Sequence, residues 1–242
     1  MWGFIVVDVN HQIAVRTLSV LIGLTSQLTK QGVPWEVNYS SNDSEDKRAW
    51  LTQSLKKYDT LVFFDHGTSF DLRPLLATPW QQACSMLIVP SFKKMIDWNR
   101  FKKTCTLEIE EPLDQRALIF DTEVNEKKPI PGPGTQLYTV TNSDARVFLL
   151  DCKQVIRKLK DKKGNFIQVP LKSTEWVRFF KERGVQVAAA VDIPCTNTIA
   201  HKCVSGLGKS NGLRLDYTNA PSRPASDANQ APHVPSSTAN IG

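Results

Sequence analysis

Asp65 stands directly after an uninterrupted apolar run, in the segment TLVFFDHG at residues 60–67. Such a run is typical of a central strand that is covered on both faces of a sheet. Ligands of open α/β sheets bind beyond the carboxyl ends of the strands, so a carboxylate at this point favours a binding role. Carboxylate oxygens are also good ligands for Mg²⁺ and Mn²⁺. The alternative is an aspartate that only caps a turn or a helix.

A second candidate segment, HKCVSGLGKS at residues 201–210, combines glycines with a lysine and a histidine. Small residues let backbone N–H groups approach phosphate oxygens, which favours a role for Gly206 and Lys209 at a phosphate. His201 is a candidate metal ligand, because imidazole binds first-row divalent metals. The segment is no Walker A loop, since Cys203 occupies a position where that motif requires glycine. A plain glycine-rich turn and a surface imidazole are the alternatives.

Two further carboxylates lie at the starts of predicted helices. Glu175 begins the segment EWVRFFKERG, where the helix dipole favours an acid, so it is either a first-turn carboxylate or a base that orients an acceptor. Asp43 follows the second predicted strand, where it could hydrogen-bond a ribose or a base. The alternative for Asp43 is a turn residue.

The elements that must position these side chains alternate between strand and helix patterns. The first five are residues 3–9, 13–32, 34–40, 44–58 and 60–64. One face of the first helix carries Leu18, Leu21, Thr25 and Leu28, and Gly32 ends it. The order strand, helix, strand, helix, strand predicts a parallel sheet with right-handed crossovers. The expected fold class is therefore α/β, with a mostly parallel central sheet flanked by helices in a single domain.

The second half of the chain has a looser pattern. A short helix is predicted near residues 72–83, and the charged, proline-rich run NEKKPIPGPG at 125–134 predicts a mobile loop. From Thr218 the chain consists mostly of Pro, Ser, Ala, Asn and Thr, which cannot bury enough apolar surface to offset the entropy of ordering. We therefore expect a folded domain over residues 1–217 and a disordered tail over 218–242.

The composition is that of a globular protein, with 242 residues, 41% hydrophobic content and a net charge of +6. The basic residues are scattered through helical segments without interleaved aromatic residues, so we expect solvated helix faces and no nucleic-acid partner. Five cysteines without a C-x-x-C pair indicate reduced thiols and a cytoplasmic location. The opening run is cut by Asp8, which indicates a strand and no signal peptide. No membrane span is expected.

Several blocks together resemble the GT-A (Rossmann-like) glycosyltransferases, the nucleotide-diphospho-sugar transferases. These blocks are FIVVDVN, VNYSSNDSEDKRAWLTQSL, DTLVFFDHGTSFD, MLIVPSFKKMIDWNRF, DARVFLLDCKQVIRKL, STEWVRFFKERGVQV and IAHKCVSG. The likeness is to the small single-domain members found in large DNA viruses and phages, and it covers most of residues 3–217. FFDHG stands where the family has Asp-x-Asp, so Asp65 matches the first acid and Gly67 replaces the second.

The resemblance implies a glycosyltransferase that moves a sugar from a nucleotide-diphospho-sugar to a glycan, protein or small-molecule acceptor of unknown identity. It implies Mn²⁺ or Mg²⁺ held by Asp65 and His201, and Glu175 as the catalytic residue that faces the acceptor. The residues that it assigns to the donor nucleotide and its diphosphate are Asp8, Asn10, Asp43, Arg48, Gly206 and Lys209.

Two other functions remain open from the sequence. The loss of the second acid favours a catalytically degenerate GT-A-like protein that binds a ligand or is associated with a virion. In that case the location would be the host cytoplasm or the virion. An unrelated Rossmann-like nucleotide binder has less support, since no G-x-G-x-x-G follows the first predicted strand.

Overall fold

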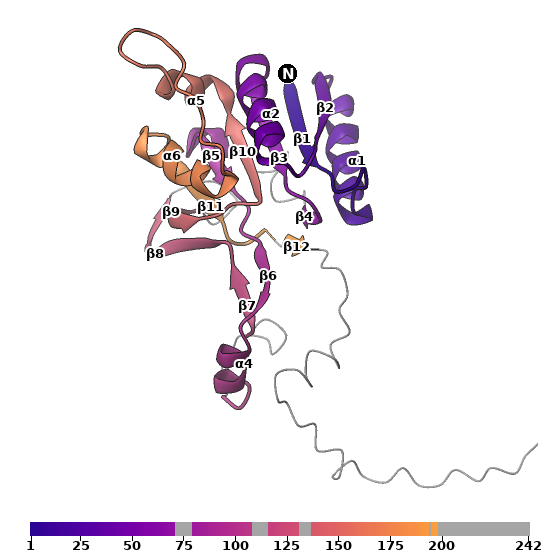
Figure 1. Ribbon diagram of the computed structural model, residues 1–242, viewed down its shortest axis with the longest axis vertical. Helices are drawn as coiled ribbons and strands as arrows, with labels where there is room; N and C mark the ends of the chain where they lie inside the picture. Colours follow the sequence, from indigo (N-terminus) through magenta and orange to yellow (C-terminus); the bar gives the residue numbers. More distant parts are fainter. Residues whose placement is uncertain (71–78, 108–115, 131–136, 194, 198–242) are drawn as a thin grey trace, which may run out of the picture. The chain divides into compact units, whose positions relative to one another are not determined.

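A central sheet of eight strands organises the protein (Figure 1). The computed structural model describes residues 1–70, 79–107, 116–130, 137–193 and 195–197. Every element named below belongs to one compact unit that spans residues 1–199. The predicted boundary at residue 217 and the predicted tail lie outside the described residues, so both stay predictions.

The first half of the chain forms the expected alternation of strands and helices. Its elements are β1 (Trp2–Val7), α1 (Val15–Lys30), β2 (Trp35–Ser40), α2 (Ser44–Lys57) and β3 (Thr60–Phe64). β1 pairs in parallel with β2 on one side and with β3 on the other. Gly32 follows α1 with a φ of 67°, and Val33 donates its backbone N–H to the carbonyl oxygen of Leu28, which is the glycine-ended helix stop that the sequence predicted.

The second half adds the remaining strands of the sheet and several short elements. In chain order these are β4 (Thr68–Phe70), the 3-10 turn η1 (Trp80–Gln82), β5 (Met86–Ile88), β6 (Phe92–Ile96), α4 (Trp98–Thr104), β7 (Leu118–Phe120), β8 (Thr122–Ile130), β9 (Leu137–Ser143), β10 (Val147–Asp151), α5 (Cys152–Lys158), the 3-10 turn η2 (Ser173–Glu175), α6 (Trp176–Glu182), β11 (Val187–Ala190) and β12 (Cys195–Asn197). β6 pairs with β7, and β12 pairs with β4, in two small separate sheets.

The strand order of the large sheet is β2-β1-β3-β10-β5-β11-β9-β8. Its pairings make β10 antiparallel to β3 and β5, and β9 antiparallel to β11 and β8, whereas the other pairs are parallel. All strands except β9 and β10 therefore run in one direction. This confirms the expected α/β class with a mostly parallel central sheet flanked by helices.

Two hydrophobic cores cover the two faces of this sheet. Consecutive strand residues point to opposite faces, so Phe4 and Val6 enter one core while Ile5 and Val7 enter the other. α1 packs on the first face, and α2, α5 and α6 pack on the second. Leu24 of α1 is fully buried, which contributes about 1.5–3 kcal/mol to the free energy of unfolding. The alternation explains the apolar run of β3, which has a core on each side.

The buried face of α1 differs in part from the predicted one. Leu21 and Leu28 are buried as expected, but Leu18 is 41% exposed and Leu24 lies in the core in its place. Thr25 is only partly buried. Apolar residues surround much of this helix, so periodicity alone did not select the stripe that meets the sheet.

The predicted loop at residues 125–134 is in part a strand, which corrects the sequence prediction. Residues 125–130 belong to β8, which pairs with β9 and places Pro129 opposite Tyr138. β8 is the last strand of the sheet, and a proline without an N–H donor is tolerated on such an edge. Residues 131–136 lie outside the described residues. Of the predicted helix at 72–83, the described part contains only the 3-10 turn η1.

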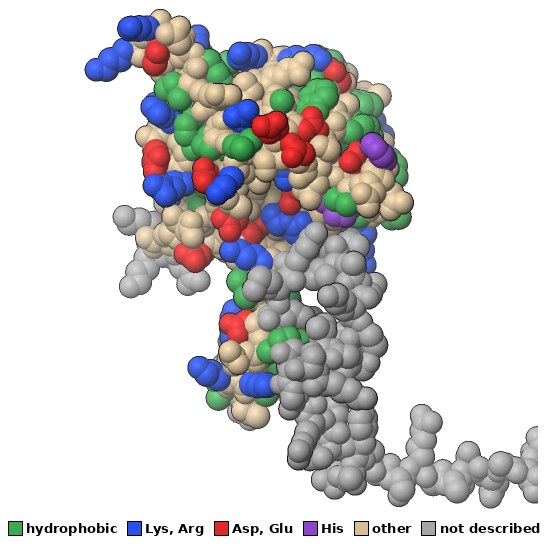
Figure 2. Space-filling view, in the orientation of Figure 1, with side chains coloured by type: hydrophobic (Ala, Val, Ile, Leu, Met, Phe, Trp, Pro, Cys, Tyr) green, Lys and Arg blue, Asp and Glu red, His purple; other side chains and the backbone are tan. Residues whose placement is uncertain are grey.

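Charged side chains are interspersed on the face shown in Figure 2, where Lys and Arg lie among Asp and Glu. None of the helices in the described ranges combines the length and the apolarity that a membrane-spanning helix requires.

Candidate functional site

The chain reverses its winding direction between β1 and β3. From β1 the chain passes through α1 to β2 on one side, and then through α2 to β3 on the other side. Because α1 and α2 cover opposite faces of the sheet, a crevice is expected beyond the carboxyl ends of β1 and β3. Asp8 directly follows β1 and Asp65 directly follows β3. Since Val6 is the register partner of Phe64, both aspartates lie beyond the same sheet edge.

The predicted nucleotide residues Asn10 and Asp43 follow carboxyl ends at this same edge. Asn10 and His11 form a tight turn with φ values of 54° and 59°, and the backbones of Val9 and Gln12 hydrogen-bond each other across it. Both turn residues are exposed. Asp43 comes after β2 and caps α2, because its Oδ2 accepts from the backbone N–H groups of Glu45 at 2.7 Å and Asp46 at 3.1 Å. The N–H groups of Asp46 and Glu45 lower the pKa of Asp43.

Asp65 begins a tight turn whose shape requires a glycine at its third position. The backbone N–H of Thr68 donates to the carbonyl oxygen of Asp65 at 3.2 Å, which closes a four-residue turn between β3 and β4. Gly67 is the third residue of the turn and has a φ of 76°. A turn of this type needs a positive φ at its third position, where glycine carries no steric cost. The glycine at position 67 therefore has a backbone reason.

Arg146 binds this turn with its side chain. Its Nε donates to Asp65 Oδ2 at 3.0 Å, and its Nη2 donates to the carbonyl oxygen of His66 at 2.7 Å. In the opposite direction, the backbone N–H of Asp65 donates to the carbonyl oxygen of Arg146 at 2.8 Å. The Arg146 side chain is 13% exposed and that of Asp65 is 25% exposed. The pair is therefore largely withdrawn from water, where charge-assisted hydrogen bonds are strong.

Each partner of this ion pair keeps one buried atom without a hydrogen bond. Within the described part of the chain, Asp65 Oδ1 and Arg146 Nη1 are buried and have no hydrogen-bond partner. A buried polar atom without a partner costs about 1–3 kcal/mol of stability. Such atoms call for an explanation, and a bound ligand is one.

A cavity of about 300 Å³ opens beside this ion pair. Its lining includes charged and hydroxyl side chains from several elements: Asp65, Lys93, Asp121, Asp144, Arg146, Ser173 and Thr174. Lys93 of β6 pairs with Asp144 at 3.0 Å, and both side chains are 41% exposed. The cavity thus combines two acid–base pairs with polar groups able to donate and accept.

Asp121 is the buried acid of this cavity. Its carboxylate accepts from the backbone N–H of Ser91 at 3.0 Å, from the Ser91 hydroxyl, and from the hydroxyl of Thr122 at 2.8 Å. Burial raises the pKa of Asp121, although the hydrogen bonds from Ser91 and Thr122 oppose this rise. The carboxyl therefore takes up a proton more readily than an exposed aspartate.

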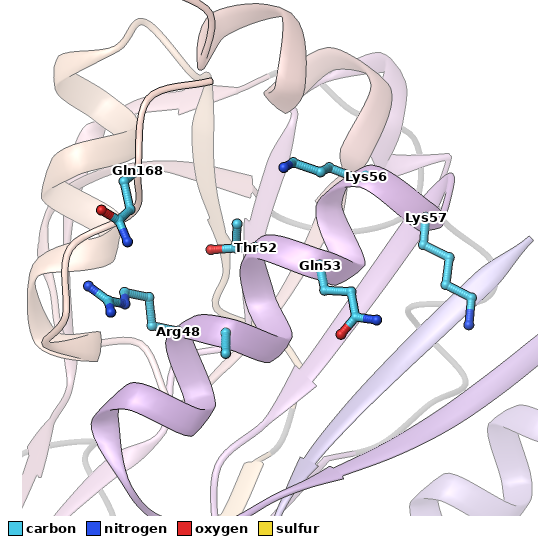
Figure 3. A pocket seen from close by; sticks show the side chains of 7 residues that line it. Arg48, Thr52, Gln53, Lys56, Lys57 and Gln168 are labelled. Atoms are coloured by element: carbon cyan, nitrogen blue, oxygen red, sulfur yellow. The ribbon is translucent and has the colours of Figure 1, made fainter. Parts of the chain in front are cut away.

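The predicted residue Arg48 lies in a different cavity. This second cavity, of about 570 Å³, is lined mainly by α2 and includes Gln168. Figure 3 shows the side chains of Arg48 and Gln168 pointing toward one another across it. Among the described residues, the lining includes Lys56 and Lys57 and contains no acid. The structure therefore does not bring Arg48 together with Asp65.

The remaining predicted residues lie at the rim or outside the described structure. Glu175 is exposed at the junction of η2 and α6, directly after the cavity residues Ser173 and Thr174. His201, Gly206 and Lys209 lie outside the described residues, so the predicted convergence of His201 with Asp65 stays a prediction. Among the residues that the structure describes, no three His, Cys, Asp or Glu side chains gather as a metal site would require.

Sequence reasoning missed Arg146, Lys93, Asp121 and Asp144. Arg146 and Asp144 lie just before the apolar run of β10, and Asp65 lies just after the apolar run of β3. A charged residue next to an apolar run was therefore the sequence signal that could have identified them. The direction of β10 decides whether residues before it reach the same edge, and no local pattern shows that direction. Asp121 sits between the three-residue strand β7 and the nine-residue strand β8.

Comparison with known proteins gives low similarities. No family model matches the chain, and no curated protein matches it in sequence. A197 from STIV is similar in structure with a TM-score of 0.43 and 15% identity, over 82% of this chain and 86% of that one. HddC from Yersinia pseudotuberculosis gives a TM-score of 0.41 and 10% identity, over 81% and 93% of the two chains.

A third solved structure is a proposed glucose-1-phosphate thymidylyltransferase from Bacillus anthracis in complex with sucrose. Its TM-score is 0.40 at 12% identity, over 89% of this chain and 96% of that one. These values are too low to assign a function to this chain.

Proposed function

We propose that the protein binds a nucleotide-diphospho-sugar in the crevice beyond β1 and β3 and transfers its sugar to an acceptor. The observation that supports this most is the set of polar residues that follow three adjacent parallel strands. Asp8 and Asn10 follow β1, Asp43 follows β2 and Asp65 follows β3, all at one sheet edge. Carboxylates and amides at such an edge suit the hydroxyl groups of a ribose and a sugar.

The nucleoside would lie on the β1 and β2 side of the crevice. Asp8 and Asn10 would accept hydrogen bonds from it, while Asp43 keeps its role at the start of α2. The sugar and diphosphate would lie on the β3 side, in the cavity of Asp65 and Arg146. Gly206 and Lys209 would add backbone and ammonium donors to the diphosphate, as the family resemblance implies.

Transfer would require an acceptor hydroxyl near Glu175. The acceptor oxygen attacks the anomeric carbon, the bond from that carbon to the diphosphate oxygen breaks, and the nucleoside diphosphate leaves with the bonding electrons. The proton of the acceptor hydroxyl passes to the Glu175 carboxylate. Glu175 is exposed beside the cavity rim, so it is open to an acceptor from solution.

The described residues do not fit the divalent metal that the resemblance implies. Oδ2 of Asp65 already binds a guanidinium, whose positive charge would repel a cation at the same carboxylate. Gly67 offers no side-chain ligand, and the described residues contain no three-ligand group. We therefore derive no step through a metal. Mn²⁺ or Mg²⁺ at Asp65 and His201 stays a prediction that the experiments below measure.

A second candidate function is binding without transfer. The glycine turn at Gly67 and the exposure of Glu175 favour it, because the turn offers no second acid and Glu175 is not enclosed in the cavity. In this case the crevice would hold the same ligand, and no nucleoside diphosphate would be released.

Calorimetry with a panel of nucleotide-diphospho-sugars would test the binding proposal. We expect one donor to bind, and we expect Asp8→Ala and Asp65→Asn each to weaken it about tenfold or more, because each removes a charged acceptor. Asp161→Asn is the matched control, since Asp161 lies in the loop after α5 and hydrogen-bonds Lys163 and Asn165. Failure of every donor to bind would contradict the proposal.

Release of nucleoside diphosphate separates the two candidate functions. Transfer or slow hydrolysis that is lost in Glu175→Gln supports a transferase. Tight binding without release, unchanged by Glu175→Gln, supports the binding protein.

A further inference from the structure

We propose that Arg146 takes the place of a divalent metal and binds the phosphate of the ligand directly, while Asp65 accepts from a hydroxyl of the same molecule. This inference rests on the proposed function and names the part of the donor that the β3 side of the crevice holds.

One donor nitrogen of the Arg146 guanidinium is available to a ligand. Its Nε and Nη2 are engaged by Asp65 and by the His66 carbonyl, whereas Nη1 is buried and has no partner within the described residues. The planar guanidinium presents its donors as a fork that matches the oxygens of a phosphate. A phosphate oxygen at Nη1 would satisfy the orphaned donor with a charge-assisted hydrogen bond.

One oxygen of the Asp65 carboxylate is likewise available to a ligand. Its Oδ1 is buried without a partner, while Oδ2 accepts from Arg146. A metal ion would satisfy Oδ1 but would leave Nη1 unsatisfied beside a second cation. Inorganic phosphate would satisfy Nη1, but it could donate to Oδ1 only from a P–OH group of the anion itself. A molecule with a phosphate and a separate hydroxyl group satisfies both atoms without placing the anion against Oδ1, and a sugar phosphate is such a molecule.

The charged groups around the ligand position have partners of their own. Lys93 contributes a second cation to the same cavity and pairs with Asp144. Asp65 pairs with Arg146, and the Asp121 carboxylate accepts hydrogen bonds from Ser91 and Thr122. Each acid of the described lining therefore has a cation or hydrogen-bond donors beside it.

The position of Arg146 is set before any ligand binds. Hydrogen bonds to the Asp65 carboxylate and to the His66 carbonyl hold the guanidinium at the end of β3. Binding a phosphate there does not require ordering a mobile side chain, which is one of the usual costs of binding.

The test measures donor binding by calorimetry in EDTA and again in Mn²⁺, for the wild type and Arg146→Gln. We expect wild-type affinity in EDTA to stay within about twofold of its value in Mn²⁺, and Arg146→Gln to weaken it about tenfold or more. Arg178→Gln is the matched control, because Arg178 is exposed on α6 and pairs with Glu182. Binding that requires Mn²⁺, or that Arg146→Gln leaves unchanged, would overturn the inference.

A second variant and a second probe keep the two proposals separable. Arg146→Lys keeps the charge but loses the fork, so it should fold if Arg146→Gln does not, and it should still weaken binding. Glucose 1-phosphate carries a phosphate and hydroxyl groups without a nucleoside. If it binds with the same dependence on Arg146 while no nucleotide sugar binds, the inference stands and the proposed function fails. If neither ligand binds in either buffer, both are wrong.

Discussion

Arg146 Nε lies 3.0 Å from Asp65 Oδ2, although 81 positions separate the two residues in the chain. The antiparallel pairing of β10 with β3 produces this contact, because it sets Val147 opposite Phe64. The residue before β10 and the residue after β3 therefore meet at the sheet edge where the parallel strands end. A strand register thus determines which cation stands beside the candidate site.

Removing the carboxylate of this pair should destabilise the protein. In Asp65→Ala, a guanidinium with a side chain only 13% exposed loses its counter-charge. Breaking a buried pair costs about 3–5 kcal/mol, and the partial exposure of Asp65 lowers our expectation to about 2 kcal/mol. Urea denaturation would measure this loss in the free energy of unfolding.

The pair of Lys93 and Asp144 is the control for that measurement. Both side chains are 41% exposed, so Asp144→Ala should cost less than about 1 kcal/mol. Equal losses in the two variants would show that burial does not strengthen the pair of Asp65 and Arg146.

Placing an acid at position 67 should destabilise the turn. Gly67 has a φ of 76°, where a residue with a Cβ pays about 1–2 kcal/mol, so Gly67→Asp should lower the free energy of unfolding by about that amount. The asparagine of Gly67→Asn has the same shape as aspartate but no charge. Comparing the two variants therefore separates the cost of the backbone conformation from the effect of the added charge. Thermal melts with and without Mn²⁺ would compare them. A stability of Gly67→Asp equal to that of the wild type would contradict the strained turn.

Asp121 should make the protein less stable as the pH rises. Its pKa is raised in the folded state, so between the unfolded value near 3.8 and the raised value the folded protein binds more protons than the unfolded chain. The free energy of unfolding must then fall with increasing pH through this interval. Urea denaturation at several pH values from about 4 upward should show this slope.

The Asp121→Asn variant provides the control for the pH slope, because it removes the titrating group. Ser91→Ala removes a donor that lowers the pKa of Asp121, so it should extend the slope to higher pH. A slope that persists in Asp121→Asn would assign it to another group.

Thiol labelling should separate the cysteines by burial. Burial raises the pKa of Cys84 to about 12 and that of Cys152 to about 12, so neither forms a reactive thiolate near neutral pH. Cys105 is exposed and should react quickly with iodoacetamide. Peptide mass spectrometry would locate the label, and urea should make Cys84 and Cys152 reactive. Fast labelling of Cys84 in the folded protein would contradict its place in the core.

The alternating first half of the fold was predictable because its signals are local. The apolar run before Asp65 predicted β3, and Gly32 marked the end of α1. Leu18 was assigned to the wrong face, because the buried stripe depends on how the helix lies on the sheet. Pro129 favoured the prediction of a loop. The residue nevertheless belongs to a strand, because the pairing of β8 with β9 at the sheet edge outweighs the local preference of proline.

The candidate site was predictable only where it depends on strand ends. Asp65 was singled out because it follows the apolar run of a predicted strand, whereas Asp8 was assigned only through the family resemblance. Arg146 was missed, since its approach to Asp65 depends on where the antiparallel β10 inserts in the sheet. The need for glycine at position 67 was also hidden, because a positive φ is a property of the turn and not of a motif.

The place of β10 between β3 and β5 has a consequence for the order in which the site is assembled during synthesis. The first three strands, β1, β2 and β3, leave the ribosome first and can pair with one another. The other edge of β3 stays unpaired until β10 has been synthesised. At a translation rate of roughly 5–20 residues per second, the 81 positions from Asp65 to Arg146 take roughly 4–16 seconds. During that interval the nascent sheet has an unpaired apolar edge and an unfinished ligand site, so this edge is where a chaperone would be of most use to the growing chain.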